Sequence, residues 1–163
     1  MPKIEPYSGF TMFFAPCRPT SRGTVQLKSP DVHEAPLIDP NYLATENDRA
    51  EAIAGSRLIR RLAATAGLAE VTKAEVRPGN TVSNDESMLQ FFREQSGSIY
   101  HLCGSCAMGG DPRESVVNSE LQVHGTRSLR VVDASIFPNI TSGNINAPTM
   151  MVAEKASQMV LGQ

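Results

Sequence analysis

The sequence predicts an α+β fold, in which a small antiparallel sheet with packed helices precedes a C-terminal strand–loop–helix segment. Two β-rich runs lie near the start, two stretches in the middle have helical spacing of apolar residues, and short apolar runs lead into a Pro-started helix at the end. A chain of 163 residues is long enough to bury a real core in about one domain.

The N-terminal β-rich runs cover residues 9–27 and meet at Pro19–Gly23, where Pro and Gly favour a turn. We therefore expect a hairpin here. A connector follows at residues 29–43, and its three prolines, at positions 30, 36 and 40, oppose a regular helix and favour an extended or turning path.

The clearest predicted helix lies within residues 45–67, with Thr45 or Asn47 available as N-cap and Gly67 as its end. Its apolar residues recur at i, i+3, i+4 and i+7: Ile59, Leu62, Ala63 and Ala66.

A second helix is predicted from Ser83, which forms a capping-box pattern with Glu86, to the residues before Gly97. We expect it to bury Met88, Phe91 and Phe92. Residues 71–78, between the two helices, indicate a linker or a short strand.

The C-terminal part predicts short strands at residues 121–124 and 129–132, joined by a turn at Gly125-Thr126. A loop of turn formers at residues 141–147 leads to Pro148, which suits the first position of a helix because it lacks an N–H. The inner face of that helix is predicted to hold Val152, Ala156, Met159 and Val160.

Composition excludes several classes of function. A net charge of −2 offers no basic surplus for a nucleic acid, and no apolar run is long enough to span a bilayer. Three cysteines are too few for a disulfide scaffold and are typical of a reducing compartment. The first ten residues lack the features of a signal peptide, so we expect a cytoplasmic protein.

His101 is a candidate base, because imidazole titrates near neutrality, although a single histidine is also compatible with a core or surface role. Cys103 and Cys106 follow it closely and raise the alternative of a zinc site. No second ligand pair is visible, so buried thiols without metal are the simpler interpretation.

Asn144 and Asn146 precede a predicted helix N-terminus, where free N–H groups and the helix dipole favour negative charge. They are equally compatible with an ordinary turn. Asp133 follows an apolar strand and could face a cofactor or simply cap a turn. No G-x-G-x-x-G or P-loop pattern is present, so the chain has no dinucleotide fingerprint of its own.

Three stretches carry a resemblance to a known family: SIYHLCGSCAMGGDP, LQVHGTRSLRVVDASIFP and SGNINAPTMMVAEKASQMV. Together with SRGTVQLKSPD and IDPNYL, they resemble the C-terminal domain of the glucose–methanol–choline (GMC) oxidoreductases, in particular the choline dehydrogenase-like branch. The similarity extends over roughly residues 23–160.

The resemblance implies an enzyme that uses flavin adenine dinucleotide (FAD) to oxidise CH–OH groups of a small alcohol. It implies that His101 is the catalytic base and that Asn144 hydrogen-bonds the substrate oxygen. The flavin would be bordered by two short segments, which contain Asp133 with Ala134 and Asn146 with Ala147 and Pro148. No metal is implied.

The resemblance also implies a division into a substrate-binding part, 1–98, and a catalytic, flavin-facing part, 99–163, which would complete a flavin-binding domain. Because the N-terminal dinucleotide-binding domain is absent from the sequence, we expect activity to require that missing half or a complementing chain. The alternatives are a non-enzymatic domain that binds a partner protein and, with less support, a small zinc-binding protein.

Overall fold

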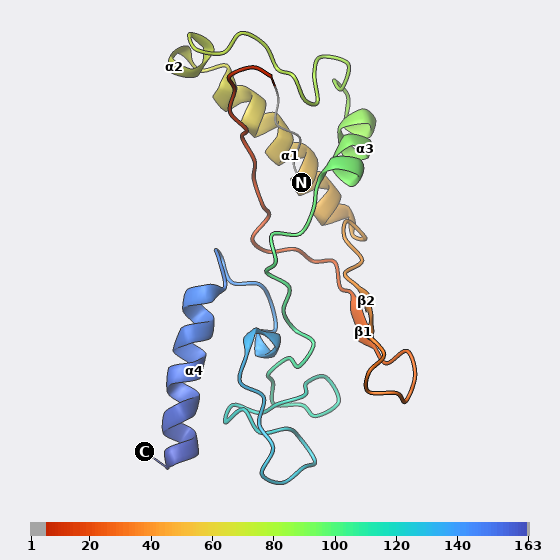
Figure 1. Cartoon of the computed structure of the whole chain (residues 1–163), viewed down its shortest axis with the longest axis vertical. Helices are drawn as coiled ribbons and strands as arrows, with labels where there is room; N and C mark the ends of the chain where they lie inside the picture. Colours follow the sequence, from red (N-terminus) through yellow and green to blue (C-terminus); the bar gives the residue numbers. More distant parts are fainter. Residues whose placement is uncertain (1–5, 163) are drawn as a thin grey trace. The chain divides into compact units, whose positions relative to one another are not determined.

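The computed structural model describes residues 6–162, which form helices and a small antiparallel sheet as the sequence predicted. Its elements, in chain order, are β1 (Thr24–Gln26), β2 (Leu37–Asp39), α1 (Glu46–Ala63), α2 (Ala66–Ala69), α3 (Asp85–Gln95), the 3-10 helix η1 (Ala134–Ile136) and α4 (Asn146–Leu161), as Figure 1 shows. Residues 1–5 and 163 of the two predicted parts lie outside the described residues.

The chain divides into two compact units, each built from separated segments. The first contains residues 6–15 and 50–96, and the second contains residues 16–49 and 97–162. The functional division at residues 98 and 99 stays a prediction. No helix within the described residues has the length and apolar character needed to cross a bilayer.

The predicted hairpin over residues 9–27 is wrong in its pairing. Strand β1 pairs with β2 in antiparallel register, with Val25 opposite Ile38, whereas residues 9–16 form no strand. The sheet therefore draws its second strand from the Pro-rich connector, whose path at residues 37–39 is extended as expected.

Two local features explain the altered pairing. The backbone N–H groups of Thr20 and Ser21 donate to the carboxylate of Asp48, so the predicted turn spends its donors on a side chain. At Gly23 a Cβ atom would clash with the backbone of Asp39 and Pro40, so only glycine permits the close approach of β2.

Helix α1 begins directly after Thr45, whose hydroxyl accepts the N–H of Asp48 at 3.3 Å, in agreement with the predicted cap. It ends at Ala63, earlier than predicted, and Gly67 lies inside α2 instead of ending the helix. Ala52 is buried and Ile59 and Ala63 are half-buried, but Leu62 and Ala66 are exposed.

Helix α3 is capped one residue later than predicted. Asn84 accepts the N–H of Ser87 at 2.9 Å, and Ser87 Oγ accepts the N–H of Asn84, which completes a capping box. Met88 is buried, and Phe91 and Phe92 are half-buried, as expected. Residues 71–78 contain no strand and form a linker.

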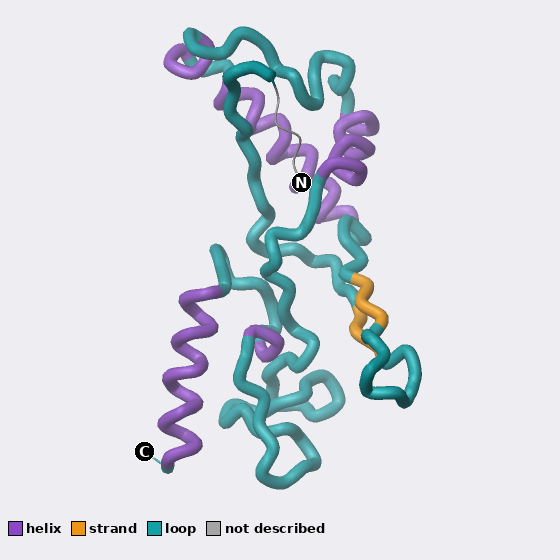
Figure 2. The backbone as a smooth tube through the Cα atoms, viewed as in Figure 1, coloured by secondary structure: helices purple, strands orange, loops and turns teal. Residues whose placement is uncertain are grey.

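In the second unit, the backbone between residues 97 and 145 is mostly loop (Figure 2). The two predicted strands at 121–124 and 129–132 do pair, but only through an isolated bridge between Gln122 and Arg130, flanked by hydrogen bonds from Val123 N to Leu129 O and from Val131 N to Leu121 O. Leu121 has a φ of 64°, which breaks the extended conformation that a longer strand would need.

The core of the second unit brings α4 against η1 and the loops. Its buried residues are Val117, Leu121, Ile136, Phe137, Ile145, Val152 and Ala156. Two expectations for α4 are wrong: Pro148 is its third residue, not its first, and Val160 is 64% exposed. The helix starts earlier because Pro148 lacks an N–H that no intrahelical acceptor would meet anywhere in the first turn.

Candidate functional site

His101 and Asn144 meet in the second unit although 43 positions separate them in sequence. His101 Nε2 lies 3.1 Å from Asn144 Oδ1, within hydrogen-bond distance. The histidine is half-buried and the asparagine is exposed. The pair can therefore be reached by a ligand, and its two members are those that the sequence singled out for catalysis.

Helix η1 anchors the turn that follows His101. Ser135 O accepts the N–H groups of Gly104 at 3.1 Å and Cys106 at 3.0 Å, and Ile136 O accepts the N–H of Met108 at 2.8 Å. Ile136 is itself only 1% exposed within the core. Because the loop that carries Asn144 begins directly after η1, one buried turn fixes the starting points of both segments.

Tyr100 precedes His101 in a backbone conformation that side chains rarely adopt. Its φ is 64°, and its side chain is 89% exposed. A large residue in the left-handed region is strained, and such residues concentrate at functional sites. No sequence pattern marked Tyr100, because a positive φ at a non-glycine residue has no reliable sequence signal.

The N-terminus of α4 has unsatisfied donors beside this pair in the chain. Ile145 precedes the helix and supplies no side-chain cap. Within the described residues, the backbone N–H groups of Asn146 and Ala147 have no acceptor, and Pro148 has no N–H. The helix dipole adds partial positive charge at this end, so an anionic or carbonyl oxygen would be stabilised here.

Asp133 and Ala134 have structural roles in η1. Asp133 Oδ1 accepts the N–H of Ser135 at 2.7 Å, so this carboxylate acts as the N-cap. Ala134 is partly buried and packs against the core. No contact joins either described side chain to His101 or Asn144, and their roles toward a cofactor stay predictions.

The zinc alternative has no support among residues 6–162, where no three His, Cys, Asp or Glu side chains gather as metal ligands. Burial raises the pKa of the Cys103 thiol, which opposes the thiolate that a metal requires. His124 instead lies 3.1 Å from Ser115 Oγ and 3.2 Å from Gly109 O, within the loop region.

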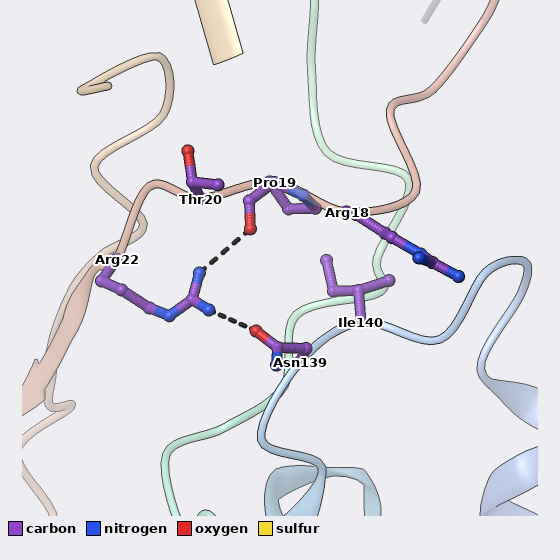
Figure 3. Close-up of a pocket in the computed structure, with 6 residues that line it drawn as sticks. All are labelled: Arg18, Pro19, Thr20, Arg22, Asn139 and Ile140. Atoms are coloured by element: carbon purple, nitrogen blue, oxygen red, sulfur yellow. Dashed lines mark hydrogen bonds between the residues drawn. The ribbon is translucent and has the colours of Figure 1, made fainter. Parts of the chain in front are cut away.

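Sequence reasoning missed two arginines that reach the loop before Asn144. Arg18 Nε donates to Ser142 Oγ at 2.9 Å, and Arg22 donates to Asn139 Oδ1. Together they line a cavity of about 380 Å³ with Pro19, Thr20, Asn139 and Ile140, and Figure 3 shows the Arg22 guanidinium turned toward both Pro19 and Asn139. Their sequence context, RPTSRG, signalled only a turn.

An α+β chain with a histidine–asparagine pair near an uncapped helix N-terminus is consistent with the C-terminal part of an oxidoreductase. Comparison with known proteins supports this class, because the family model of the GMC oxidoreductases matches residues 19–153. The chain therefore belongs to the GMC oxidoreductase family.

Two curated relatives illustrate the similarity. An alcohol dehydrogenase [acceptor] of Pseudomonas putida is 43% identical over 159 residues, which are 98% of this chain and 29% of that protein. An oxygen-dependent choline dehydrogenase of Pseudomonas syringae pv. syringae is 45% identical over 155 residues, which are 95% of this chain and 27% of that protein. The chain thus spans less than a third of the length of these relatives.

A solved structure gives the same result for the fold. The crystal structure of pyridoxine 4-oxidase from Mesorbium loti matches with a TM-score of 0.84 and 33% identity, covering 90% of this chain and 28% of that one. The arrangement described above is therefore that of the C-terminal portion of a GMC oxidoreductase.

Proposed function

We propose that this chain is the substrate-binding and catalytic portion of an FAD-dependent alcohol oxidoreductase. The observation that carries the proposal is the 3.1 Å contact between His101 Nε2 and Asn144 Oδ1, two residues before an uncapped helix N-terminus. The curated relatives act on alcohols or choline by their names, which is consistent with a CH–OH substrate.

The residues at the start of α4 fit a flavin as cofactor. GMC oxidoreductases are FAD-dependent. The unpaired N–H groups of Asn146 and Ala147 suit the oxygen at the negatively charged edge of a reduced flavin, and Asp133 with Ala134 would border the ring from η1. The bound flavin would supply the hydride acceptor.

His101 would hold the proton released by the substrate hydroxyl. Nε2 is the ring atom that faces Asn144, so an alcohol oxygen bound beside this pair would meet the base directly. Asn144 Oδ1 contacts the histidine, which leaves its Nδ2 group to donate to the same substrate oxygen. The pair would thereby orient the reacting carbon, which is the positioning contribution to catalysis.

The chain would not complete a flavin site by itself. It carries no dinucleotide fingerprint, which the GMC relatives would have to supply from the part of their length that this chain does not match. We therefore propose that catalysis needs a flavin-binding half, joined to this chain or supplied as a complementing chain. We also propose a cytoplasmic location, because all three cysteines are free thiols.

A chimera tests the proposed activity. This chain would replace the matching segment of the Pseudomonas putida alcohol dehydrogenase, to which it is 43% identical, and alcohol-dependent reduction of a dye would be measured. We expect turnover that falls at least 100-fold in His101→Ala, since general base catalysis contributes about 10²–10⁴-fold. The matched control is His33→Ala, on the exposed connector between β1 and β2. Normal turnover in His101→Ala would refute the role of His101.

The isolated chain provides an independent measurement. After incubation with excess FAD and desalting, we expect a colourless protein, and retained flavin absorbance would refute the requirement for a second half. Exposed apolar residues on α4, including Met150, Met151 and Leu161, favour one alternative, a partner-binding domain without enzyme activity. Size-exclusion chromatography that shows a monodisperse monomer, together with an inactive chimera, would support that alternative.

A further inference from the structure

The loop that carries Asn144 has few hydrogen bonds of its own. In the part of the chain that the structure describes, the backbone of residues 138–144 makes one backbone–backbone hydrogen bond, from Gly143 N to Thr141 O. A loop with so few internal bonds samples several conformations unless side chains from elsewhere hold it. Asn144 needs such support to keep its 3.1 Å contact with His101.

The support comes from the segment that precedes β1. Arg18 Nε donates to Ser142 Oγ at 2.9 Å, only two residues before Asn144. Arg22 donates through one terminal nitrogen to Asn139 Oδ1 and through the other to Pro19 O, at 3.0 Å. The two arginines therefore bind the loop near its start and near Asn144 (Figure 3).

The arginine segment is itself fixed by a buried carboxylate. Asp48, 5% exposed in the first turn of α1, accepts the N–H groups of Thr20 at 2.7 Å and Ser21 at 2.8 Å and the hydroxyl of Thr20 at 2.9 Å. The residues between Arg18 and Arg22 are thus held at three points. A rigid segment can position the loop, whereas a mobile one could not.

We propose that Arg18 and Arg22 are positioning residues, which hold the loop of residues 139–144 so that Asn144 stays against His101. The inference rests on the proposed function, in which this pair binds the substrate hydroxyl. Neither arginine needs to touch substrate or flavin, because each acts through the loop.

The first test reads the pair directly in the full flavin-free chain. The ¹⁵N signals of the His101 ring report its hydrogen bonding, and only His33 and His124 need to be distinguished from it. We expect Asn144→Ala to shift these signals, and Arg18→Met to shift them in the same direction, because methionine preserves the length but cannot donate. Arg18→Gln places a donor nitrogen at the position of Nε and should restore the wild-type signals.

Two further variants make the test independent of one substitution. Ser142→Ala removes the acceptor of the Arg18 bond and should reproduce the shift even if Arg18→Met fails to fold. Arg127→Met is the matched control, since Arg127 is exposed and has no hydrogen-bond partner among the described residues. Unchanged His101 signals in both Arg18→Met and Ser142→Ala would overturn the proposal, as would an equal shift in Arg127→Met.

Kinetics of the chimera connect the positioning to catalysis. We expect Arg18→Met to lower kcat at least tenfold with less than a threefold change in KM, and Arg18→Gln to recover most of the loss, since misplacement of a catalytic group acts mainly on the reaction step. An inactive wild-type chimera would refute the proposed function and leave the histidine signals as the test of positioning. An active chimera whose kcat is insensitive to Arg18→Met would refute the positioning role alone.

Discussion

The buried carboxylate of Asp48 accepts the backbone N–H of Thr20 at 2.7 Å, across 28 positions of the chain. A carboxylate has four lone-pair sites and no donor when ionised, which matches the donors that Thr20 and Ser21 offer. This contact joins the first turn of α1 to the segment that holds the arginines, and it makes the second unit sensitive to acid.

We expect the stability of the second unit to fall below about pH 4 in a way that depends on Asp48. Burial alone would raise the pKa of Asp48, but the hydrogen bonds from Ser21 and Thr20 outweigh burial and hold the pKa well below its ordinary value. A depressed folded pKa adds stability above the unfolded pKa of about 3.9, and this stability is lost as the pH falls toward the folded value.

Amide hydrogen exchange at Thr20 and Ser21 measures this effect locally. At pH 7, Asp48→Asn should lower their protection about 10-fold to 100-fold, because losing a charge-assisted hydrogen bond costs about 1.5–3 kcal/mol. The difference between wild type and Asp48→Asn should shrink below pH 4. A difference that stays constant down to pH 2 would contradict the assignment. Asp31→Asn, on the exposed connector, is the control.

Substitutions of Asn144 should separate hydrogen bonding from size. In the chimera, Asn144→His should retain activity within about tenfold, because imidazole can also donate to a substrate oxygen, and the resemblance to the family allows either residue at this position. Asn144→Leu preserves the volume but has no polar atom, and kcat should fall about 100-fold. Equal kcat values for the two variants would show that Asn144 does not contact the reacting oxygen.

Truncation of Ile136 should destabilise the second unit and disturb His101 together. Ile136 is 1% exposed in the core, and Ile→Ala substitutions at such positions cost about 2–5 kcal/mol. Its carbonyl also accepts Met108 N in the turn after His101, so the His101 ring signals should broaden or move. Urea unfolding followed by circular dichroism measures the first effect. Val160→Ala, at a position 64% exposed, should change stability by less than about 0.5 kcal/mol.

Gly55 and Gly67 should respond oppositely to alanine. Helix propensity favours alanine over glycine by about 1 kcal/mol. At Gly55, however, the added Cβ would clash with the ring of Phe14, which also packs on Phe92 with ring centroids 5.6 Å apart. At Gly67 nothing lies within 4 Å. We expect Gly55→Ala to lower the unfolding free energy by about 1–3 kcal/mol and Gly67→Ala to raise it slightly. A stabilising Gly55→Ala would show that the Phe14 contact is absent in solution.

The sequence predicted those elements whose signals are local. Helices α1 and α3 follow from apolar spacing and from capping residues within four positions of each other, although the capping box lies at Asn84 and not at Ser83. Short-range patterns could not pair the strands. A carboxylate 28 positions away, and a glycine needed for close approach to Pro40, selected β2 over residues 9–16 as the partner of β1.

The same division applies to the site. The sequence by itself identified His101 and Asn144 as residue types able to carry the chemistry, and its motifs placed the chain in the correct family. Only the tertiary structure brought the two side chains to 3.1 Å, assigned the Asp133 side chain to a cap, and revealed that Arg18 reaches Ser142. The reason is physical: motifs record local backbone preferences and residue chemistry, whereas contacts across more than 40 positions depend on how the whole core around η1 and α4 packs.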